Sequence, residues 1–299
     1  MKRWRASIAA FAALWGTLLG TLLAALLAAA AQAGEPRGEI TRLTVPSAAL
    51  GRDLAVSLYT PAVAPGTRLA VLYLLHGTNG NENDWPVMGG VREALDAGIA
   101  SGALPPMLVV MPDAGNSWYA NEMAQALTQD LPAYVDAHYP TLACRAGRAI
   151  GGTSMGGFGA LLYAMDHPRF YAAAFGLSAA LWAPMPEDET ARAKRPTRMF
   201  RGAFGDPLDW RRFNAWNVFP RLPAYARDRD RTPVRLSVGT TDFGNLRTMN
   251  HAFVDQLAEL GVTVPLETDE GGHEWRLWAQ QLPAALRWVA ERLRGSCPA

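Results

Sequence analysis

Residues Gly151–Gly159 read GGTSMGGFG, so that five glycines surround the single serine Ser154. Glycine in the interior of a helix or strand costs about 0.5–1 kcal/mol relative to alanine, so this cluster needs a structural reason. The candidate reasons are a flexible linker, a turn, or close packing of a helix on a strand. "GRAIGGTS" before the cluster predicts a strand, and residues 156–166 after it predict a helix. The flanking elements therefore favour a tight strand-to-helix turn.

Within this cluster, residues 152–156 form the pattern G-x-S-x-G with Ser154 at its centre. Between a strand and a helix, this pattern is typical of a nucleophile elbow, which holds a serine hydroxyl above the sheet in a strained conformation. A Cβ two residues to either side would collide with neighbouring backbone, which explains the glycines. Without that context the pattern is weak, because serines between glycines also occur in flexible loops.

The rest of the chain predicts a fold that suits such a turn. Apolar runs predict strands at 39–47, 53–61, 68–77, 105–115, 147–154, 170–180 and 234–242, and a final strand with its loop at 262–275. Helices are predicted at 87–100, 121–138 (with a kink at Pro132), 156–166, 245–260 and 276–294. This alternation predicts an α/β fold, a mostly parallel sheet with helices on both faces. In such sheets ligands bind beyond the carboxyl ends of the strands.

A serine hydroxyl becomes a useful nucleophile when a base removes its proton, and histidine is the usual base. Of the five histidines, His273 alone follows the last predicted strand, in "EGGHEW", where two glycines let a loop bring the ring over the sheet edge. We therefore expect His273 to be the general base. The other four are assigned capping, solvated or loop-shaping roles: His76, His138, His167 and His251.

The imidazole needs a carboxylate to hold it in one tautomer, and Asp242 ends the predicted strand "VRLSVGTTD". The chain order Ser154, Asp242, His273 is the one found in α/β-hydrolases. Asp269 and Glu270 are competitors, but they lie too close to His273 on the same strand and loop.

Acyl transfer also needs donors for the oxyanion that forms on the attacked carbonyl. The backbone N–H of Met155, directly after the serine, is one expected donor. The second is expected in the loop "HGTNG" after an early buried strand, and the backbone N–H of Thr78 is the candidate. His76 in the same loop is expected to shape it.

Four segments in this order resemble one esterase family of α/β-hydrolases: "YLLHGTNGNENDW", "GGTSMGGFGALLYAMDHP", "VGTTDF" and "EGGHEWRLW". That family includes S-formylglutathione hydrolase (esterase D), feruloyl and acetylxylan esterases, and the mycobacterial mycolyltransferases. The resemblance spans about residues 40–289 and implies the α/β-hydrolase fold. It also implies Ser154 as nucleophile, Asp242 as acid, His273 as base, and the amides of Thr78 and Met155 as the oxyanion hole.

Residues 182–231 depart from the family and are expected to form an irregular, cap-like insertion. The insertion is rich in arginine and in aromatic residues: Trp182, Phe200, Phe204, Trp210, Phe213, Trp216 and Phe219. They either line a pocket over the serine or pack on one another, and the pocket is slightly favoured. Three residues are the candidates for substrate contact: Trp182, and Trp118 and Tyr119 from "NSWYANE".

The N-terminus predicts export. A basic start, "MKRWR", precedes an apolar run and the small residues "AQA" at 31–33, as in a secretory signal peptide covering residues 1–33. The long apolar run leaves an uncleaved membrane anchor as the alternative. We therefore expect a catalytic domain at 34–299 and a periplasmic or secreted location. Removing the signal changes 28 basic and 27 acidic residues to 25 and 27, a net charge of −2 that offers no footprint for nucleic acid.

Only Cys144 and Cys297 are present, and in an oxidising compartment they form either a disulfide or two buried thiols. No sequence motif of a metal site occurs, and no cofactor is expected. The overall expectation is an exported serine carboxylesterase acting on a small-molecule, glycan or lipid ester through an acyl-enzyme. The alternatives are an acyltransferase of the mycolyltransferase type and, from another class, a non-catalytic binding module. The oligomeric state is not predicted.

Overall fold

The computed structural model describes residues 37–297 of the 299-residue chain. The predicted signal peptide at 1–33 lies outside these residues and stays a prediction. Among the helices of the described part, none combines the length and the apolar character needed to cross a membrane.

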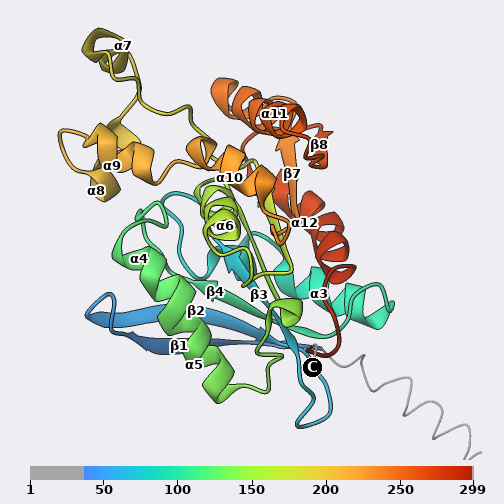
Figure 1. Cartoon of the computed structure of the whole chain (residues 1–299). Helices are drawn as coiled ribbons and strands as arrows, with labels where there is room; N and C mark the ends of the chain where they lie inside the picture. Colours follow the sequence, from blue (N-terminus) through green and yellow to red (C-terminus); the bar gives the residue numbers. More distant parts are fainter. Residues whose placement is uncertain (1–36, 298–299) are drawn as a thin grey trace, which may run out of the picture. The chain divides into compact units, whose positions relative to one another are not determined.

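The described residues form an eight-stranded sheet in the order β1-β2-β4-β3-β5-β6-β7-β8 (Figure 1). The strands are β1 Glu39–Ser47, β2 Arg52–Thr60, β3 Ala70–Leu75, β4 Met107–Pro112, β5 Arg148–Thr153, β6 Ala173–Leu177, β7 Val234–Gly239 and β8 Leu266–Asp269. β1 and β2 form an antiparallel hairpin, β2 also pairs antiparallel with β4, and every other pair is parallel. The predicted mostly parallel sheet is thus confirmed.

The central strands are apolar throughout because both of their faces are covered. In β3, Val71 and Tyr73 belong to one core cluster, whereas Leu72 and Leu74 belong to another on the opposite face. Successive side chains of a strand point to opposite faces, so an alternation of two clusters requires an unbroken apolar run.

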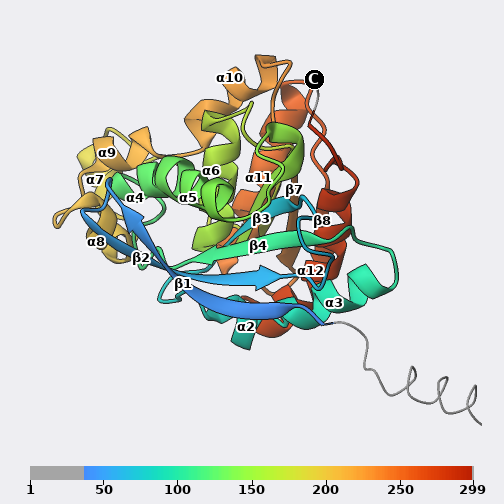
Figure 2. The same cartoon turned by 90° about the horizontal axis from the view of Figure 1, so that it is seen from below.

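Helices cover both faces of the sheet, as Figure 2 shows. The first core cluster is packed by α4 Glu122–Gln125, α5 Leu131–His138, α6 Met155–Asp166, α10 Leu222–Arg227 and α11 Gly244–Glu259. The second is packed by α2 Asp84–Val87, α3 Val91–Ala100 and α12 Trp275–Ala290. The predicted α/β-hydrolase architecture with helices on both faces is therefore confirmed.

Two predicted helices differ from the structure. The helix expected at 87–100 corresponds to α3, which begins at Val91, because Gly90 before it adopts a left-handed φ of 59° and separates it from the short helix α2. The helix expected at 121–138 is interrupted by a π-helical turn at Ala126–Asp130. Pro132, the second residue of α5, has no N–H to donate to the carbonyls of this π-helical turn.

The predicted irregular insertion at 182–231 folds into short helices: α7 Glu189–Ala193, α8 Arg201–Phe204, α9 Trp210–Ala215 and α10, with 3₁₀ turns at Arg198–Phe200 and Phe219–Arg221. Helices of four to six residues are too short for an apolar period to be recognised in the sequence. In both views α8 and α9 lie near α4, whereas α7 stands well away from α4 in Figure 1 (Figures 1 and 2).

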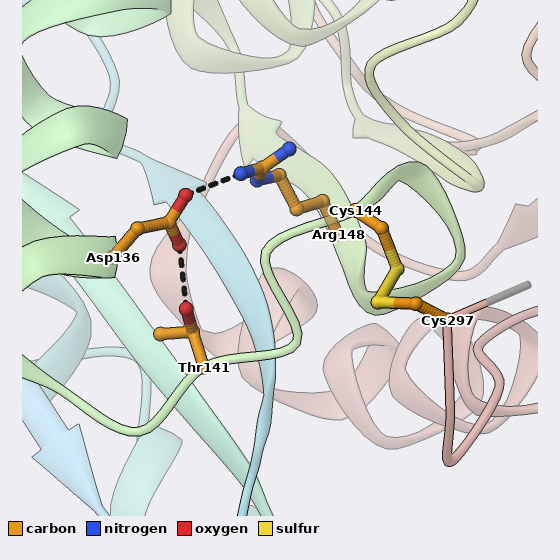
Figure 3. Close-up of a disulfide and its surroundings, with 5 residues drawn as sticks. All are labelled: Asp136, Thr141, Cys144, Arg148 and Cys297. Atoms are coloured by element: carbon orange, nitrogen blue, oxygen red, sulfur yellow. Dashed lines mark hydrogen bonds and ion pairs between the residues drawn. A yellow bond between two sulfur atoms is a disulfide. The ribbon is translucent and has the colours of Figure 1, made fainter. Parts of the chain in front are cut away.

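At the edge of the sheet where β5 begins, the chain is cross-linked (Figure 3). Cys144 and Cys297 form a disulfide with a Cα–Cα distance of 6.0 Å, which ties the end of the chain to its middle. Nearby, the buried guanidinium of Arg148 pairs with Asp136, whose other oxygen accepts a hydrogen bond from Thr141 Oγ1 at 2.6 Å. Of the two alternatives, a disulfide and two buried thiols, the structure has the disulfide.

Candidate active site

Ser154 lies between β5 and α6 in a backbone conformation that serine rarely adopts, with φ 54° and ψ −119°. The turn is possible because the neighbouring residues have no side chain. A Cβ on Gly152 would lie 2.6 Å from the carbonyl carbon of Gly156, and one on Gly156 would collide with the carbonyl oxygen of Leu75. The two glycines therefore leave room for a strained, partly accessible serine.

His273 reaches Ser154 from the loop between β8 and α12, at a distance of 2.8 Å between Nε2 and Oγ. Its other ring nitrogen, Nδ1, lies 2.8 Å from Oδ1 of Asp242, in the loop after β7. An ionised carboxylate can only accept, so Nδ1 carries the hydrogen and Nε2 is free to accept the hydroxyl proton of Ser154. The three side chains, 119 and 31 residues apart in sequence, form one hydrogen-bonded line.

The Asp242 carboxyl is held ionised. Burial on its own would raise its pKa, but hydrogen bonding to His273 and to the hydroxyl of Ser178 holds the pKa below the ordinary value of 3.8. Its competitor Asp269 is engaged elsewhere, since its carboxylate accepts a hydrogen bond from the Gln281 amide at 2.7 Å. Asp242, and not Asp269, is therefore the carboxylate that holds His273.

The two expected oxyanion donors lie at this same edge. Met155 is the first residue of α6, and Thr78 lines the cavity in front of Ser154. Within the described residues neither backbone N–H donates to a protein acceptor. A Cβ on Gly77 would lie 3.3 Å from the Cβ of Ser154, so the loop before Thr78 passes close to the nucleophile. A helix N-terminus beside a free amide suits developing negative charge.

His76 holds that loop in place, the role expected for it. The Ala114 N–H donates to Nε2 at 2.9 Å, so Nε2 carries no hydrogen and Nδ1–H donates to the carbonyl of Gly77 at 2.7 Å. The ring is therefore neutral, and burial lowers the pKa of His76. Its backbone carbonyl accepts a hydrogen bond from the Tyr119 hydroxyl at 2.9 Å.

A cavity of about 560 Å³ opens in front of Ser154. Of the residues expected to contact substrate, Trp118 and Trp182 line it, together with Met199 from the insertion. Tyr119 does not. Its side chain is fully buried beneath the loop of His76, and that role corrects the expectation of substrate contact.

Three other aromatics of the insertion, Phe200, Phe204 and Phe213, pack on one another. Phe200 is the centre, with ring centroids 4.6 Å from Trp118, 5.4 Å from Trp182 and 4.7 Å from Phe213. Both readings of this segment therefore hold in part, because Trp182 and Met199 face the cavity while the rings behind them form a small core. Trp118 is fixed in addition by its indole N–H, which donates to the Met199 carbonyl at 2.9 Å.

Further residues around the triad were not expected from the sequence. Phe243, Trp275 and Trp278 line the cavity, and each stands within five residues of Asp242 or His273 in the chain. That proximity was the only available signal. Within residues 37–297, no cluster of His, Cys, Asp and Glu is arranged to hold a metal ion.

Comparison with known proteins identifies the family. Residues 47–289 match a family model described as "Putative esterase". The chain belongs to this esterase family. As a member it is a carboxylic ester hydrolase of the serine hydrolase class, and the resemblance inferred from its motifs is confirmed.

Individual relatives are distant. An acetyl esterase of Caldicellulosiruptor saccharolyticus is 26% identical over 235 residues, which make up 75% of this chain and 84% of the relative. The diacylglycerol acyltransferase/mycolyltransferase Ag85A of Mycobacterium gordonae is 30% identical over 62% of this chain, which spans about half (53%) of that relative. Among solved structures, a ferulic acid esterase superposes with a TM-score of 0.72 at 23% identity, over 86% of this chain and 100% of that one. The last likeness concerns the fold.

Proposed function

We propose that the protein is an exported serine carboxylesterase that works through an acyl-enzyme on Ser154. One observation carries the proposal: Ser154, His273 and Asp242 form a continuous hydrogen-bonded line with two links of 2.8 Å. No cofactor takes part in this reaction.

In the first half of the proposed reaction, His273 Nε2 removes the hydroxyl proton as Ser154 Oγ bonds to the ester carbonyl carbon. The negative charge moves to the carbonyl oxygen, where the amides of Thr78 and Met155 stabilise it; one such donor is commonly worth about 10²–10³ in rate. As the tetrahedral intermediate collapses, His273 gives the proton to the leaving alcohol. The acyl group stays on Ser154.

In the second half, water attacks the acyl carbon while His273 Nε2 takes a proton from it. Collapse returns that proton to Ser154 Oγ and releases the carboxylic acid. Throughout, Asp242 keeps the imidazole in one tautomer and stabilises the imidazolium that forms twice in each turnover.

Two features support export. The basic start and apolar run at residues 1–33 have the pattern of a signal peptide, and the Cys144–Cys297 disulfide suits an oxidising compartment. A periplasmic or secreted location is therefore part of the proposal. The mass of the protein isolated from expressing cells tests it. A mass equal to that of residues 34–299 indicates that the signal peptide was removed, whereas the full-length mass indicates that it was not.

An acyltransferase is the second candidate, supported by the 30% identity to a mycolyltransferase. It would use the same acyl-enzyme but pass the acyl group to a sugar or lipid hydroxyl instead of water. The chemistry of the first half is common to both, so the acceptor alone distinguishes them.

The test is hydrolysis of p-nitrophenyl acetate, butyrate, longer acyl and feruloyl esters by the mature protein and by Ser154→Ala. We expect loss of about 10⁴-fold or more in kcat for the variant, because the nucleophile is absent. Turnover unchanged in Ser154→Ala would overturn the mechanism. Product analysis with trehalose or another polyol present separates the candidates, since transfer outpacing hydrolysis would favour the acyltransferase.

A further inference from the structure

Trp278 of α12 contacts one triad residue, His273, and the neighbouring Ser178. Its ring edge faces the His273 ring with centroids 4.9 Å apart and an angle of 89°. Its indole N–H donates to Ser178 Oγ at 3.1 Å, in the interior beneath the site. Phe243 also stacks on His273, with centroids 4.7 Å apart, so two aromatic rings contact the imidazole.

Ser178, directly after β6, is a strained residue in an unusual place. It is fully buried, and its φ of 47° lies in the left-handed region. Serine adopts this region at an energetic cost, whereas glycine adopts it without one. Its backbone N–H donates to the carbonyl of Ser237 at 2.7 Å. Nothing about the backbone here requires a hydroxyl, so the side chain must have its own reason to be present.

The hydroxyl of Ser178 accepts one hydrogen bond, and its own hydrogen is available to donate a second. It accepts from Trp278, and a hydroxyl can both accept and donate. The nearby Asp242 carboxyl has a lowered pKa to which this hydroxyl contributes. Oδ2 of Asp242 is buried, and in the described part of the chain no donor forms a well-aligned hydrogen bond with it. The hydroxyl of Ser178 is therefore the candidate donor to this buried oxygen.

We propose that Trp278 and Ser178 are positioning residues for the catalytic acid. The indole N–H orients the Ser178 hydroxyl toward Oδ2 of Asp242, which leaves Oδ1 for His273. The chain of contacts then runs from Trp278 through Ser178, Asp242 and His273 to Ser154, and the Trp278 ring also touches His273 directly. This inference rests on the proposed function of the triad.

Other groups around Asp242 do not perform this task. Oδ1 accepts the backbone N–H of Phe243 at 2.8 Å in addition to His273. On its outer side Asp242 shares a cavity with polar residues of α11, among them the charged or titratable Arg247, His251 and Asp255. Arg247 is engaged with the carbonyl of Thr240 at 3.1 Å. Ser178 is thus the inner support of the carboxylate.

The first test uses Trp278→Phe, which keeps an aromatic ring and removes the N–H, Ser178→Ala, and the double variant. We expect each single variant to lower kcat by about tenfold with KM nearly unchanged, because the defect lies in proton transfer and not in substrate binding. The double variant should lose little more than either single one, since both remove the same support. Losses that multiply in the double variant would overturn the connected arrangement.

The second readout is the pH dependence of kcat/KM. Without the hydroxyl, the acid limb of the profile should move to higher pH by about 0.5 unit, because a carboxylate that has lost one donor interacts more strongly with the imidazolium beside it. A purely structural role leaves the acid limb where it is. An unmoved limb in Ser178→Ala therefore contradicts the proposal.

A comparison of Ser178→Gly with Ser178→Ala separates position from stability. Glycine relieves the left-handed strain, so Ser178→Gly should melt higher than Ser178→Ala, yet both should lose activity equally. Activity that follows the melting temperature would overturn the proposal.

Matched controls are Trp288→Phe on the far part of α12 and Ser237→Ala, a buried serine without a side-chain partner in the described residues; both should keep full kcat. If Ser154→Ala were active, the proposed function would fail, whereas full activity in Ser178→Ala would overturn only this inference.

Discussion

The two ends of the parallel strands differ in how they are built. All six described non-glycine residues with a left-handed φ follow the carboxyl ends of β3, β4, β5 and β6: Asn79, Trp118, Tyr119, Asn121, Ser154 and Ser178. The opposite edge carries instead the Arg148–Asp136 pair and the Cys144–Cys297 disulfide (Figure 3). Strained backbone is thus found at the carboxyl ends of the strands, where the chemistry is proposed, and the cross-links are found at the opposite ends.

This difference predicts that substitutions at the two edges affect different measurements. At the catalytic edge, changes should lower activity with little loss of stability. At the cross-linked edge, changes should lower the free energy of unfolding and leave the activity of the folded molecules intact. Variants that affect both quantities at either edge would remove the distinction.

The largest effect is expected for Asp242→Asn. An amide can present its N–H to His273 and so favour the wrong tautomer, and we expect kcat to fall by about 10⁴-fold. Urea unfolding should give nearly the same midpoint as the wild type. Steady-state ester hydrolysis measures the first quantity, and a loss below tenfold would show that Asp242 is not the partner of His273.

At the opposite edge, Asp136→Asn should be the most damaging single change. It leaves the guanidinium of Arg148 buried without a charged partner, which commonly costs about 3–5 kcal/mol. Chemical denaturation should register that loss while kcat/KM of the folded fraction is kept. Glu93→Gln, which breaks an exposed pair with Arg92, is the control and should cost under about 0.5 kcal/mol.

Removal of the disulfide is expected to come next. Cys144 and Cys297 are 153 residues apart, so the cross-link restrains a large part of the unfolded chain. Replacing both by serine should lower the unfolding free energy by roughly 2–5 kcal/mol with activity at 25 °C retained. If the oxidised and the serine forms melted at the same temperature, the disulfide would have no part in stability.

The smallest effect concerns pH and His76. Burial lowers its folded pKa below the ordinary 6.5, so an unfolded chain binds a proton at a pH where the folded one does not. The stability it contributes is complete above about pH 6.5 and is lost as the pH falls toward the folded pKa, by at most about 1.4 kcal/mol per unit. Between pH 7 and 5, His76→Gln should therefore show a shallower decline of unfolding free energy than the wild type. Equal slopes would contradict the neutral, buried ring.

The sequence predicted the parts of the molecule whose reasons are local. The glycines around Ser154, the unbroken apolar run of β3 and the loop around His273 each follow from neighbours in the chain. The break at Gly90 and the π-helical turn before α5 were missed because a helical period continues through both. The burial of Tyr119 and the contact of Trp278 with Ser178 depend on residues 43 and 100 positions away, which no local pattern can reveal.

The central claim is that His273 activates Ser154, and reaction with a fluorophosphonate probe tests it most directly. Peptide mass spectrometry of the labelled mature protein should find one modified residue, Ser154, with no label in Ser154→Ala and much slower labelling in His273→Ala. Labelling at another residue, or equal rates in the wild type and His273→Ala, would contradict the account.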